Sequence, residues 1–189
     1  MADWSLRYWK GGVELRALGL WLDAHEPRPA PDLAFVSHAH ADHIADHERV
    51  IASTGTLRLM RSRLSGDRSE DGLDFGRPRS FQGAGRPFQL TLFPAGHVLG
   101  SAMALIESDG TSLLYTGDFK LRRGVSAESC EPHPADVLIM ETTYGRPEYS
   151  FPPTSEVLDG VLRFCREALD NDETPVLLGY SLGKSQEIL

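Results

Sequence analysis

The most informative stretch of the sequence is the run Asp32–Ser37 (DLAFVS) together with the six residues that follow it, His38–His43 (HAHADH). The first part is short and apolar, which is typical of a strand buried in a sheet. The second part combines imidazoles with a carboxylate, and these side chains bind Zn²⁺ and also Fe or Mn. A polar loop with incidental histidines is the alternative interpretation, but this density of metal-binding side chains directly after a buried strand favours a metal site.

The spacing within this motif predicts more than one binding point. Residues two apart in an extended chain share a face, so His38 and His40 can point the same way. Asp42 and His43 come next, as the chain turns into a helix that the composition of Ala41–Arg49 predicts. The motif can therefore supply ligands to two adjacent clusters as well as to one tetrahedral site.

Two later strands end in residues that could complete these clusters. The alternating run Phe88–Phe93 (FQLTLF) leads into Gly96 and His97, and the run Ser112–Thr116 (SLLYT) leads into Asp118. A lone histidine after a strand is usually a surface residue, and a Gly-Asp pair there is usually a turn. Their value lies in following the first motif in order along the chain.

The remaining pattern alternates strands and helices, which indicates an α/β fold. Further strands are expected within Val13–Asp23 and over Ala102–Glu107, Asp136–Glu141 and Pro175–Gly179, and helices over Thr56–Leu64, Thr154–Leu169 and Lys184–Leu189. Ser108-Asp109-Gly110 predicts a hairpin turn. Ser65–Gly85 is polar and predicts a hairpin or loop, and Thr154 or Ser155 is expected to cap its helix.

Composition limits the class of protein. The chain has 189 residues, of which 41% are hydrophobic and 24% charged, as in a soluble globular protein. No apolar run approaches the ~18 residues of a membrane span, and no secretory signal begins the chain. Cys130 and Cys165 suit a reducing compartment, so we expect a cytoplasmic protein without membrane contact. The net charge of −8 argues against binding nucleic acid by bulk charge, but not against a nuclease whose positive charge comes from metal ions.

These motifs together resemble a known family. The HAHADH motif, His97 and Asp118 resemble the metal-binding motifs of the metallo-β-lactamase fold, and Asp23 resembles the early aspartate that braces the metal loop of that fold. Four further stretches are similar to its β-CASP nuclease branch, namely Pro94–Ala102 (PAGHVLGSA), Tyr115–Phe119 (YTGDF), Glu141–Gly145 (ETTYG) and Val176–Leu189 (VLLGYSLGKSQEIL). That branch contains the polyadenylation-factor endonuclease, ribonucleases, and DNA-repair nucleases of the Artemis and ligase-associated exonuclease type.

The resemblance implies the fold and its domains. We expect an incomplete four-layer αβ/βα metallo-β-lactamase sandwich over residues 1–147 and the start of a β-CASP domain over residues 148–189. The later histidines of the family have no counterpart before Leu189. The resemblance therefore implies a truncated member of the branch.

The resemblance also implies the site residues. Two divalent metal ions are expected, with Zn²⁺ as the first choice, and their ligands are listed by ion: His38, His40 and His97 for one, and Asp42, His43 and a bridging Asp118 for the other. Asp42, Asp118 and Glu141 would be catalytic, and Glu141 would partner a later histidine in protonating the leaving group. The resemblance implies no metal role for His25, His47 or His133, which are expected to be non-ligands.

The implied activity is that of a metal-dependent phosphodiesterase or nuclease that hydrolyses RNA or DNA through a metal-bridged hydroxide. Two ions can activate water and neutralise the phosphate together. A metallo-hydrolase of small substrates such as lactones or thioesters is one alternative, because fold does not determine chemistry. A β-CASP scaffold without catalytic activity is the other.

Weaker signals concern substrate contacts. Lys120 and Arg122 follow Asp118 and could line a phosphate channel, or form an ordinary solvated loop. Gly179–Ser185 (GYSLGKS) has three residues before Gly-Lys-Ser, where a nucleotide-binding P-loop needs four. We therefore reject the NTPase interpretation and retain Lys184 only as a candidate phosphate contact.

Overall fold

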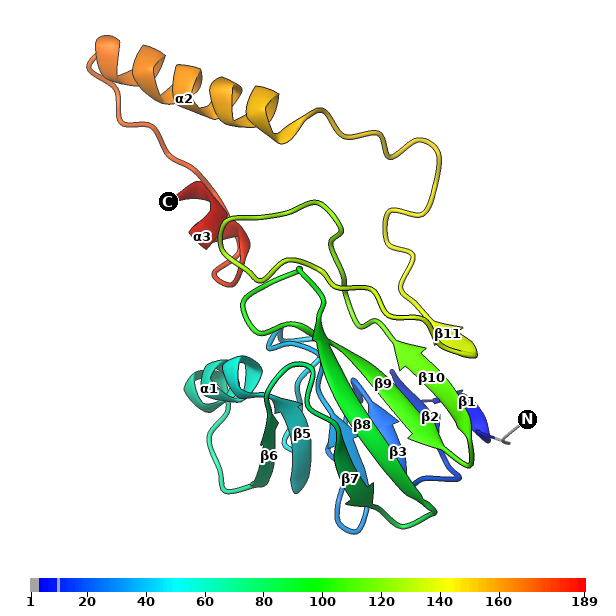
Figure 1. Ribbon diagram of the computed structural model, residues 1–189. Coiled ribbons are helices and arrows are strands. Elements are labelled where there is room, and N and C mark those ends of the chain that lie inside the picture. Colours follow the sequence, from blue (N-terminus) through cyan, green and yellow to red (C-terminus); the bar gives the residue numbers. More distant parts are fainter. Residues whose placement is uncertain (1–3, 10) are drawn as a thin grey trace. The chain divides into compact units, whose positions relative to one another are not determined.

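The computed structural model describes residues 4–9 and 11–189 of the chain (Figure 1). The chain divides into two compact units, one of residues 1–141 with Leu189 and the other of Thr142–Ile188. The expected domain boundary after residue 147 stays a prediction. In the described part of the chain, no helix has the length and apolar character needed to cross a membrane.

The first sheet contains six strands among the described residues, in the order β1-β2-β3-β4-β5-β6. They are β1 (Leu6–Trp9), β2 (Gly12–Leu15), β3 (Leu20–Leu22), β4 (Leu33–Phe35), β5 (Arg49–Ser53) and β6 (Ser69–Leu73). β1 to β3 pair antiparallel, whereas β3 to β6 run parallel. The strands expected within Val13–Asp23 and at Asp32–Ser37 are thus confirmed as β2, β3 and β4.

The second sheet contains five strands within the described ranges, in the order β11-β10-β9-β8-β7. They are β7 (Arg79–Gln82), β8 (Pro87–Pro94), β9 (Ala102–Ser108), β10 (Thr111–Tyr115) and β11 (Val137–Ile139). The predicted turn is confirmed, because Asp109 (φ 50°) and Gly110 (φ 71°) form a two-residue connection between the antiparallel strands β9 and β10.

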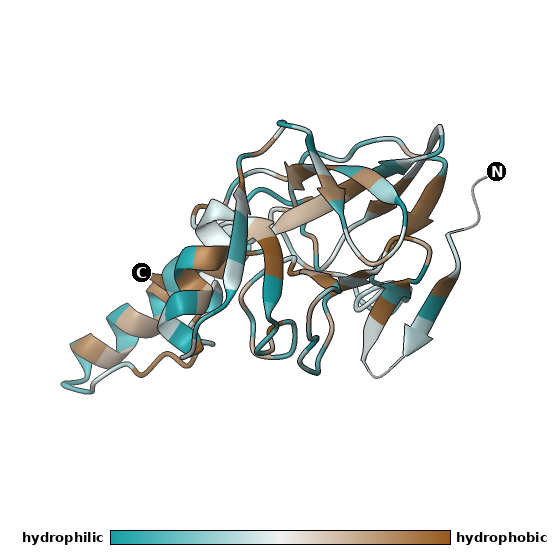
Figure 2. Cartoon of the chain, turned by 90° about the horizontal axis from the view of Figure 1, so that it is seen from below, coloured by the Kyte–Doolittle hydropathy of each residue, from teal (hydrophilic) through white to brown (hydrophobic). Residues whose placement is uncertain are grey.

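Apolar side chains from both sheets form one core. The first sheet contributes Leu20, Leu22, Leu33, Phe35 and Ile51, and the second contributes Leu90, Leu92, Ala104, Ile106 and Leu113, all fully buried. Figure 2 shows the strands of both sheets with their apolar segments in brown. The packing of one sheet on the other therefore determines where the ends of their strands meet.

Helix α1 (Thr54–Arg63) packs beside β5 and β6 (Figure 1). Ser53 is its N-cap, and the Ser53 hydroxyl oxygen accepts a hydrogen bond from the Thr56 amide at 3.0 Å. Leu57 and Met60 are buried, and the helix expected over Thr56–Leu64 is confirmed. Among the described residues of this unit it is the one helix, so the expected four-layer sandwich is represented by its two sheets and α1.

The helix predicted over Ala41–Arg49 is wrong. The chain makes a single turn, in which the His43 amide donates to the His40 carbonyl, and then runs irregularly into β5. The polar groups of this segment bond to residues far away in sequence. The Glu48 amide donates to the Arg28 carbonyl, and the His47 Nδ1 accepts from the Arg28 amide at 3.2 Å. These long-range partners replace the local hydrogen bonds of a helix.

Ser65–Gly85 contains two strands, but they do not form the predicted hairpin. β6 pairs with β5 in the first sheet, and β7 pairs with β8 in the second. The strand expected at Asp136–Glu141 is shorter, and it lies at the edge of its sheet, where Leu138 is 56% exposed. Among the described residues it pairs with β10 alone, so this apolar run forms an edge strand and not a buried one.

The second unit contains α2 (Thr154–Asp170) and α3 (Lys184–Ile188), which confirms both predicted helices. The N-cap residue of α2 is Pro153, with no side-chain cap, so the prediction of Thr154 or Ser155 is wrong. No strand forms at Pro175–Gly179, because the described residues of this unit contain no other strand with which to pair.

Truncation in the shared core gives a test of this packing. We expect Leu90→Ala to lower the free energy of unfolding by about 2–5 kcal/mol, because Leu90 is fully buried between the sheets. Leu121→Ala is the matched control, since Leu121 is 68% exposed and its truncation should change stability by less than about 0.5 kcal/mol. Urea unfolding followed by circular dichroism measures both, and equal losses in the two variants would contradict the assigned core.

Candidate metal centre

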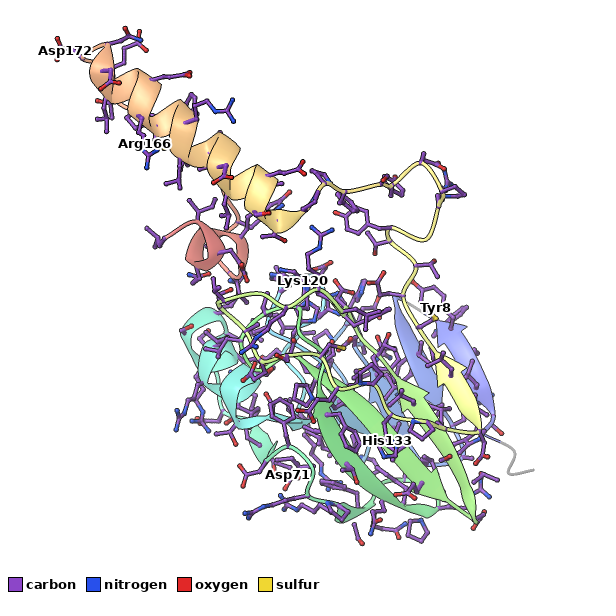
Figure 3. The ribbon with its side chains drawn as sticks, turned by 45° about the horizontal axis from the view of Figure 1, so that its top comes forward. Tyr8, Asp71, Lys120, His133, Arg166 and Asp172 are labelled. Carbon is purple, nitrogen blue, oxygen red and sulfur yellow. The ribbon has the colours of Figure 1, made fainter. Side chains whose placement is uncertain are left out.

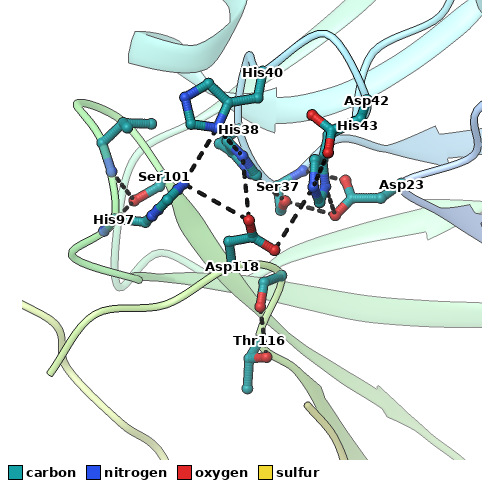
Figure 4. Close-up of polar contacts among 12 residues, drawn as sticks. Asp23, Ser37, His38, His40, Asp42, His43, His97, Ser101, Thr116 and Asp118 are labelled. Carbon is teal, nitrogen blue, oxygen red and sulfur yellow. Dashed lines mark hydrogen bonds and ion pairs between the residues drawn. The ribbon is translucent and has the colours of Figure 1, made fainter. Parts of the chain in front are cut away.

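Four strand ends bring polar side chains to one edge of the two-sheet unit (Figure 4). Asp23 follows β3, and Ser37 and His38 follow β4. These two strands are parallel neighbours, so they end side by side. His97 follows β8, and Asp118 follows β10. Ligands expected from separate parts of the sequence therefore meet because both sheets end there.

Three imidazoles form the first donor group. The Nε2 of His38 lies 2.9 Å from the Nδ1 of His40, and the Nε2 of His97 lies 3.2 Å from the same Nδ1. His38 is fully buried, and the other two rings are partly exposed. The ring nitrogens lie within 4.8 Å of one another, so the structure brings this predicted set together.

A second donor group consists of His38, His43 and Asp118, so it shares His38 with the first group. The Asp118 Oδ1 lies 3.6 Å from the His43 Nε2, and the Asp118 Oδ2 lies 4.0 Å from the His38 Nε2 and 3.7 Å from the His97 Nε2. One carboxylate thus faces both groups, with one oxygen toward each (Figure 4). This is the arrangement needed for a carboxylate that bridges two cations.

Asp42 lies at the rim of the second group. Its Oδ2 is 3.7 Å from the His43 Nε2, but its side chain is 74% exposed, and the compact donor set contains His38 in its place. The expected ligand roles stay predictions. None of His25, His47 or His133 belongs to either donor group in the described part of the chain.

The buried carboxylate of Asp23 accepts four hydrogen bonds. Its Oδ1 accepts from the Ser37 amide at 2.7 Å, and its Oδ2 accepts from the hydroxyls of Ser37 (2.6 Å) and Tyr115 (2.9 Å) and from the Nδ1 of His43 (2.9 Å). Asp23 has a φ of 47°, a left-handed conformation that an aspartate adopts more readily than most residues. These partners support the bracing role that the sequence predicts for Asp23.

This network sets the tautomers of two histidines. The His43 Nδ1 donates to Asp23, so the lone pair of its Nε2 faces Asp118. The Ser37 hydroxyl donates to Asp23 and therefore accepts from the His38 Nδ1, which lies 3.0 Å away. Both Nε2 atoms then carry a lone pair that can bind a cation. The sequence reasoning missed Ser37 and Tyr115, although each adjoins a quoted motif.

The electrostatics of the centre suit a cation. Burial, followed by the repulsion of His40 and His43, lowers the pKa of His97 to about 4. Burial and the neighbouring histidines also lower the pKa of His38. For His43, burial lowers the pKa, but the hydrogen bond and charge of Asp23 outweigh it, so the pKa is raised. Neutral imidazoles beside carboxylates are the donors that divalent transition metals prefer, so the residues fit such an ion.

Two glycines permit the strand ends to approach this closely. Gly117 has a φ of 52°, and a Cβ there would lie 2.4 Å from the Cβ of Ser37. Gly96 has a φ of 74°, and a Cβ there would lie 2.5 Å from the Lys120 carbonyl oxygen. A side chain at Gly117 would push Asp118 away from Ser37, and one at Gly96 would push the His97 loop away from the segment that contains Lys120.

The other predicted site residues are more exposed than Asp23 and His38. The Glu141 amide donates to the Thr116 hydroxyl at 3.4 Å. Burial raises the pKa of Asp118; the charge of His43 opposes this shift, and the charge of Glu141 adds to it. Lys120 lies on the loop after Asp118 (Figure 3), and its amide donates a hydrogen bond to the Ala95 carbonyl at 2.9 Å. Arg122 is exposed on the same loop. Lys184 opens α3 in the other unit, so its role as a phosphate contact stays a prediction.

Comparison with known proteins identifies the family. Residues 11–144 match the model of the metallo-beta-lactamase superfamily. The chain belongs to this superfamily. The predicted metallo-β-lactamase fold is thereby confirmed.

Several relatives of this metallo-β-lactamase chain carry names of nucleic-acid enzymes. It is 51% identical over 187 residues to a probable DNA ligase of Opitutus terrae, a match that covers 98% of this chain and 18% of that protein. It is 32% identical over 166 residues to the DNA cross-link repair protein SNM1 of Arabidopsis thaliana, a match that covers 79% of this chain and 32% of that protein. It is 33% identical over 99 residues to an RNase J-like protein of Methanocaldococcus jannaschii, covering 51% and 24%. The chain thus spans a third or less of the length of these relatives. The family match and the similarity to these proteins confirm the predicted resemblance to the nuclease branch.

The Asp23 network gives a test of how the ligands are oriented. We expect Asp23→Asn to weaken Zn²⁺ binding by about 10–100-fold, because an amide NH₂ would face the donors of Ser37, His43 and Tyr115. Asp32→Asn is the matched control, since Asp32 accepts a hydrogen bond from the Trp21 indole, outside the two donor groups. Competition with a chromophoric chelator measures the affinity, and an unchanged value in Asp23→Asn would contradict the bracing role.

A buried histidine outside the centre predicts how stability depends on pH. Burial and the charge of Arg28 lower the pKa of His47 to about 4, although Asp23 and Asp46 oppose them. Between its usual pKa of 6.5 and about 4, the unfolded chain binds a proton that the folded chain does not. Burial of the neutral His47 therefore contributes up to about 3 kcal/mol to the free energy of unfolding. This contribution is complete above pH 6.5 and is lost as the pH falls toward 4.

We expect His47→Gln to flatten this part of the profile, because glutamine does not titrate. Urea unfolding from pH 7.5 to 4.5, with EDTA in every sample, measures the difference between the two proteins. Parallel profiles would contradict the lowered pKa.

Proposed function

We propose that this metallo-β-lactamase chain carries the catalytic metal centre of a nuclease, which hydrolyses phosphodiester bonds of RNA or DNA. The observation that carries the proposal is the Asp118 carboxylate, which faces His43 with one oxygen and His38 and His97 with the other. Two adjacent donor groups joined by one carboxylate are suited to a pair of divalent ions.

Each donor group has a separate role in the proposal. His38, His40 and His97 would hold one ion, and His43, Asp118 and the rim residue Asp42 would hold the other. Bound there, two Zn²⁺ ions would supply Lewis-acid charge and lower the pKa of a coordinated water. Asp23 and Ser37 orient the imidazoles, and Glu141, whose charge acts on Asp118, is the candidate partner of a later histidine in protonating the leaving group.

The charge of the chain explains why metal ions matter for an anionic substrate. The net charge of −8 would repel a polynucleotide. Two divalent ions would add about four positive charges at the centre itself. Lys120 and Arg122, two and four residues after Asp118, would add side-chain charge close to the same strand end.

The names of the relatives support nucleic acid as the substrate. They include a DNA cross-link repair protein, an RNase J-like protein and an endoribonuclease of Gibberella zeae that is 38% identical over 104 residues. Both DNA and RNA occur among these names. The proposal therefore includes both polymers.

The test compares substrates and one ligand variant. We expect the Zn²⁺-loaded chain to cleave end-labelled single-stranded RNA or DNA, and Asp118→Asn to reduce the rate at least about 100-fold, because the bridging charge contributes several kcal/mol to a metal-assisted transition state. Asp109→Asn, in the hairpin turn between β9 and β10, is the matched control and should keep the rate.

The same preparations separate the alternatives. Hydrolysis of 4-nitrophenyl esters or a lactone without any cleavage of nucleic acid would replace the nuclease with a small-molecule hydrolase. Chain purified without chelator that contains almost no metal would indicate a non-catalytic scaffold. Equal cleavage by the wild type and Asp118→Asn would contradict the proposed centre.

A further inference from the structure

The loop that carries His97 has to be held against the first sheet. His97 is the one member of the first donor group that follows a strand of the second sheet, between β8 and β9. Inside the loop, the Ser101 hydroxyl oxygen accepts from the amides of His97 (3.0 Å) and Val98 (3.2 Å). These bonds shape the loop, but they do not determine how far His97 lies from His40.

A contact at Gly100 attaches this loop to the first sheet. The Gly100 carbonyl oxygen accepts from the hydroxyls of Ser53 at 2.5 Å and Thr56 at 2.9 Å, at the junction of β5 and α1. Gly100 has a φ of 76°, and a Cβ there would lie 2.7 Å from the Thr56 amide nitrogen. Backbone therefore packs directly on backbone, and one glycine joins the His97 loop to the helix start.

Glu128 binds the backbone amide of the same glycine, Gly100. The Glu128 Oε2 accepts from the Gly100 amide at 2.9 Å. Glu128 lies in residues 117–136, the segment that begins beside Asp118 and ends before β11. A hydrogen bond to an ionised acceptor is stronger than one between neutral groups. This carboxylate thus links the segment that carries Asp118 to the loop that carries His97.

The middle of that segment buries few apolar side chains, because Leu121 is 68% exposed and Val125 is 87% exposed. Its flanks are attached by backbone bonds from Lys120 to Ala95 and from Glu131 to Pro94, both at 2.9 Å. The side-chain bond of Glu128 lies between these two attachments and acts three residues after His97.

We infer that Glu128 is a positioning residue of the metal centre, which holds Gly100 so that His97 stays within reach of the ion bound by His38 and His40. The inference rests on the proposed binding of metal at this centre. A ligand that is held in place binds more tightly, and removal of such a support costs about 10–100-fold in affinity. Glu128 would therefore govern the affinity of the first site more than that of the second.

The test is metal titration of two Glu128 variants. We expect Glu128→Ala to bind Zn²⁺ about 10–100-fold more weakly at one of two sites, with the other unchanged. Glu128→Gln should restore the affinity to within about threefold, because its amide oxygen still accepts the Gly100 hydrogen bond. The absorption spectrum of the Co²⁺-substituted chain should lose intensity in Glu128→Ala and regain it in Glu128→Gln.

Glu131→Ala is the matched control, since it removes the same charge from the same segment but only the Glu131 backbone contacts Pro94. It should bind like the wild type. Equal weakening in Glu131→Ala, or no rescue by Glu128→Gln, would overturn the positioning role in favour of general electrostatics.

The failure of the inference is distinguishable from that of the proposed function. Wild-type affinity at both sites of Glu128→Ala overturns the inference alone and leaves the metal centre intact. A wild-type chain that binds no Zn²⁺ overturns the proposed function and the inference with it. Melting curves of the metal-free variants, expected to match the wild type, show that each variant is folded.

Discussion

The structure of the centre depends on one buried carboxylate. Asp23 accepts hydrogen bonds from the Ser37 amide and hydroxyl, from His43 and from Tyr115, which come from the loop after β4 and from β10. A carboxylate held by this many donors is fixed in orientation. Through it, the first sheet, the histidine motif and the second sheet are connected by polar bonds as well as by the apolar core.

The carboxylate is effective because the backbone around it is already in place. The parallel pairing of β3 and β4 sets Asp23 beside Ser37, and Gly117 allows β10 to end against the same serine. The centre is therefore a product of where strands end, and its chemistry comes from short loops added at those ends.

The sequence predicted the parts of this arrangement that are local. The motif after a buried strand and the order of His97 and Asp118 were enough to predict the group His38, His40 and His97. In the second group the structure has His38, and not the predicted Asp42, beside His43 and Asp118. Residues that act through long-range contacts were not predictable in the same way. Tyr115 reads as an ordinary strand residue, and its bond to Asp23 spans 92 positions in the chain.

The incorrect predictions have the same cause. Ala41–Arg49 has the composition of a helix, but its polar groups bond to Asp23 and Arg28, so tertiary contacts override local propensity. Pro175–Gly179 has the composition of a strand, but a strand requires a neighbour, and neighbours are not visible in composition. β5 was not predicted, for the converse reason. Its short run of residues does not indicate a strand, but pairing with β4 and β6 stabilises it as one.

The apolar layer between the sheets has a consequence for the spacing of the donor groups. His38 and His43 extend from one sheet, and His97 and Asp118 from the other, so a small lateral slip of one sheet over the other would move these side chains apart. A close-packed interior resists such a slip, because a packed core has few voids and transmits strain. A loosened core would thus change the distances within the donor groups before the chain lost its architecture.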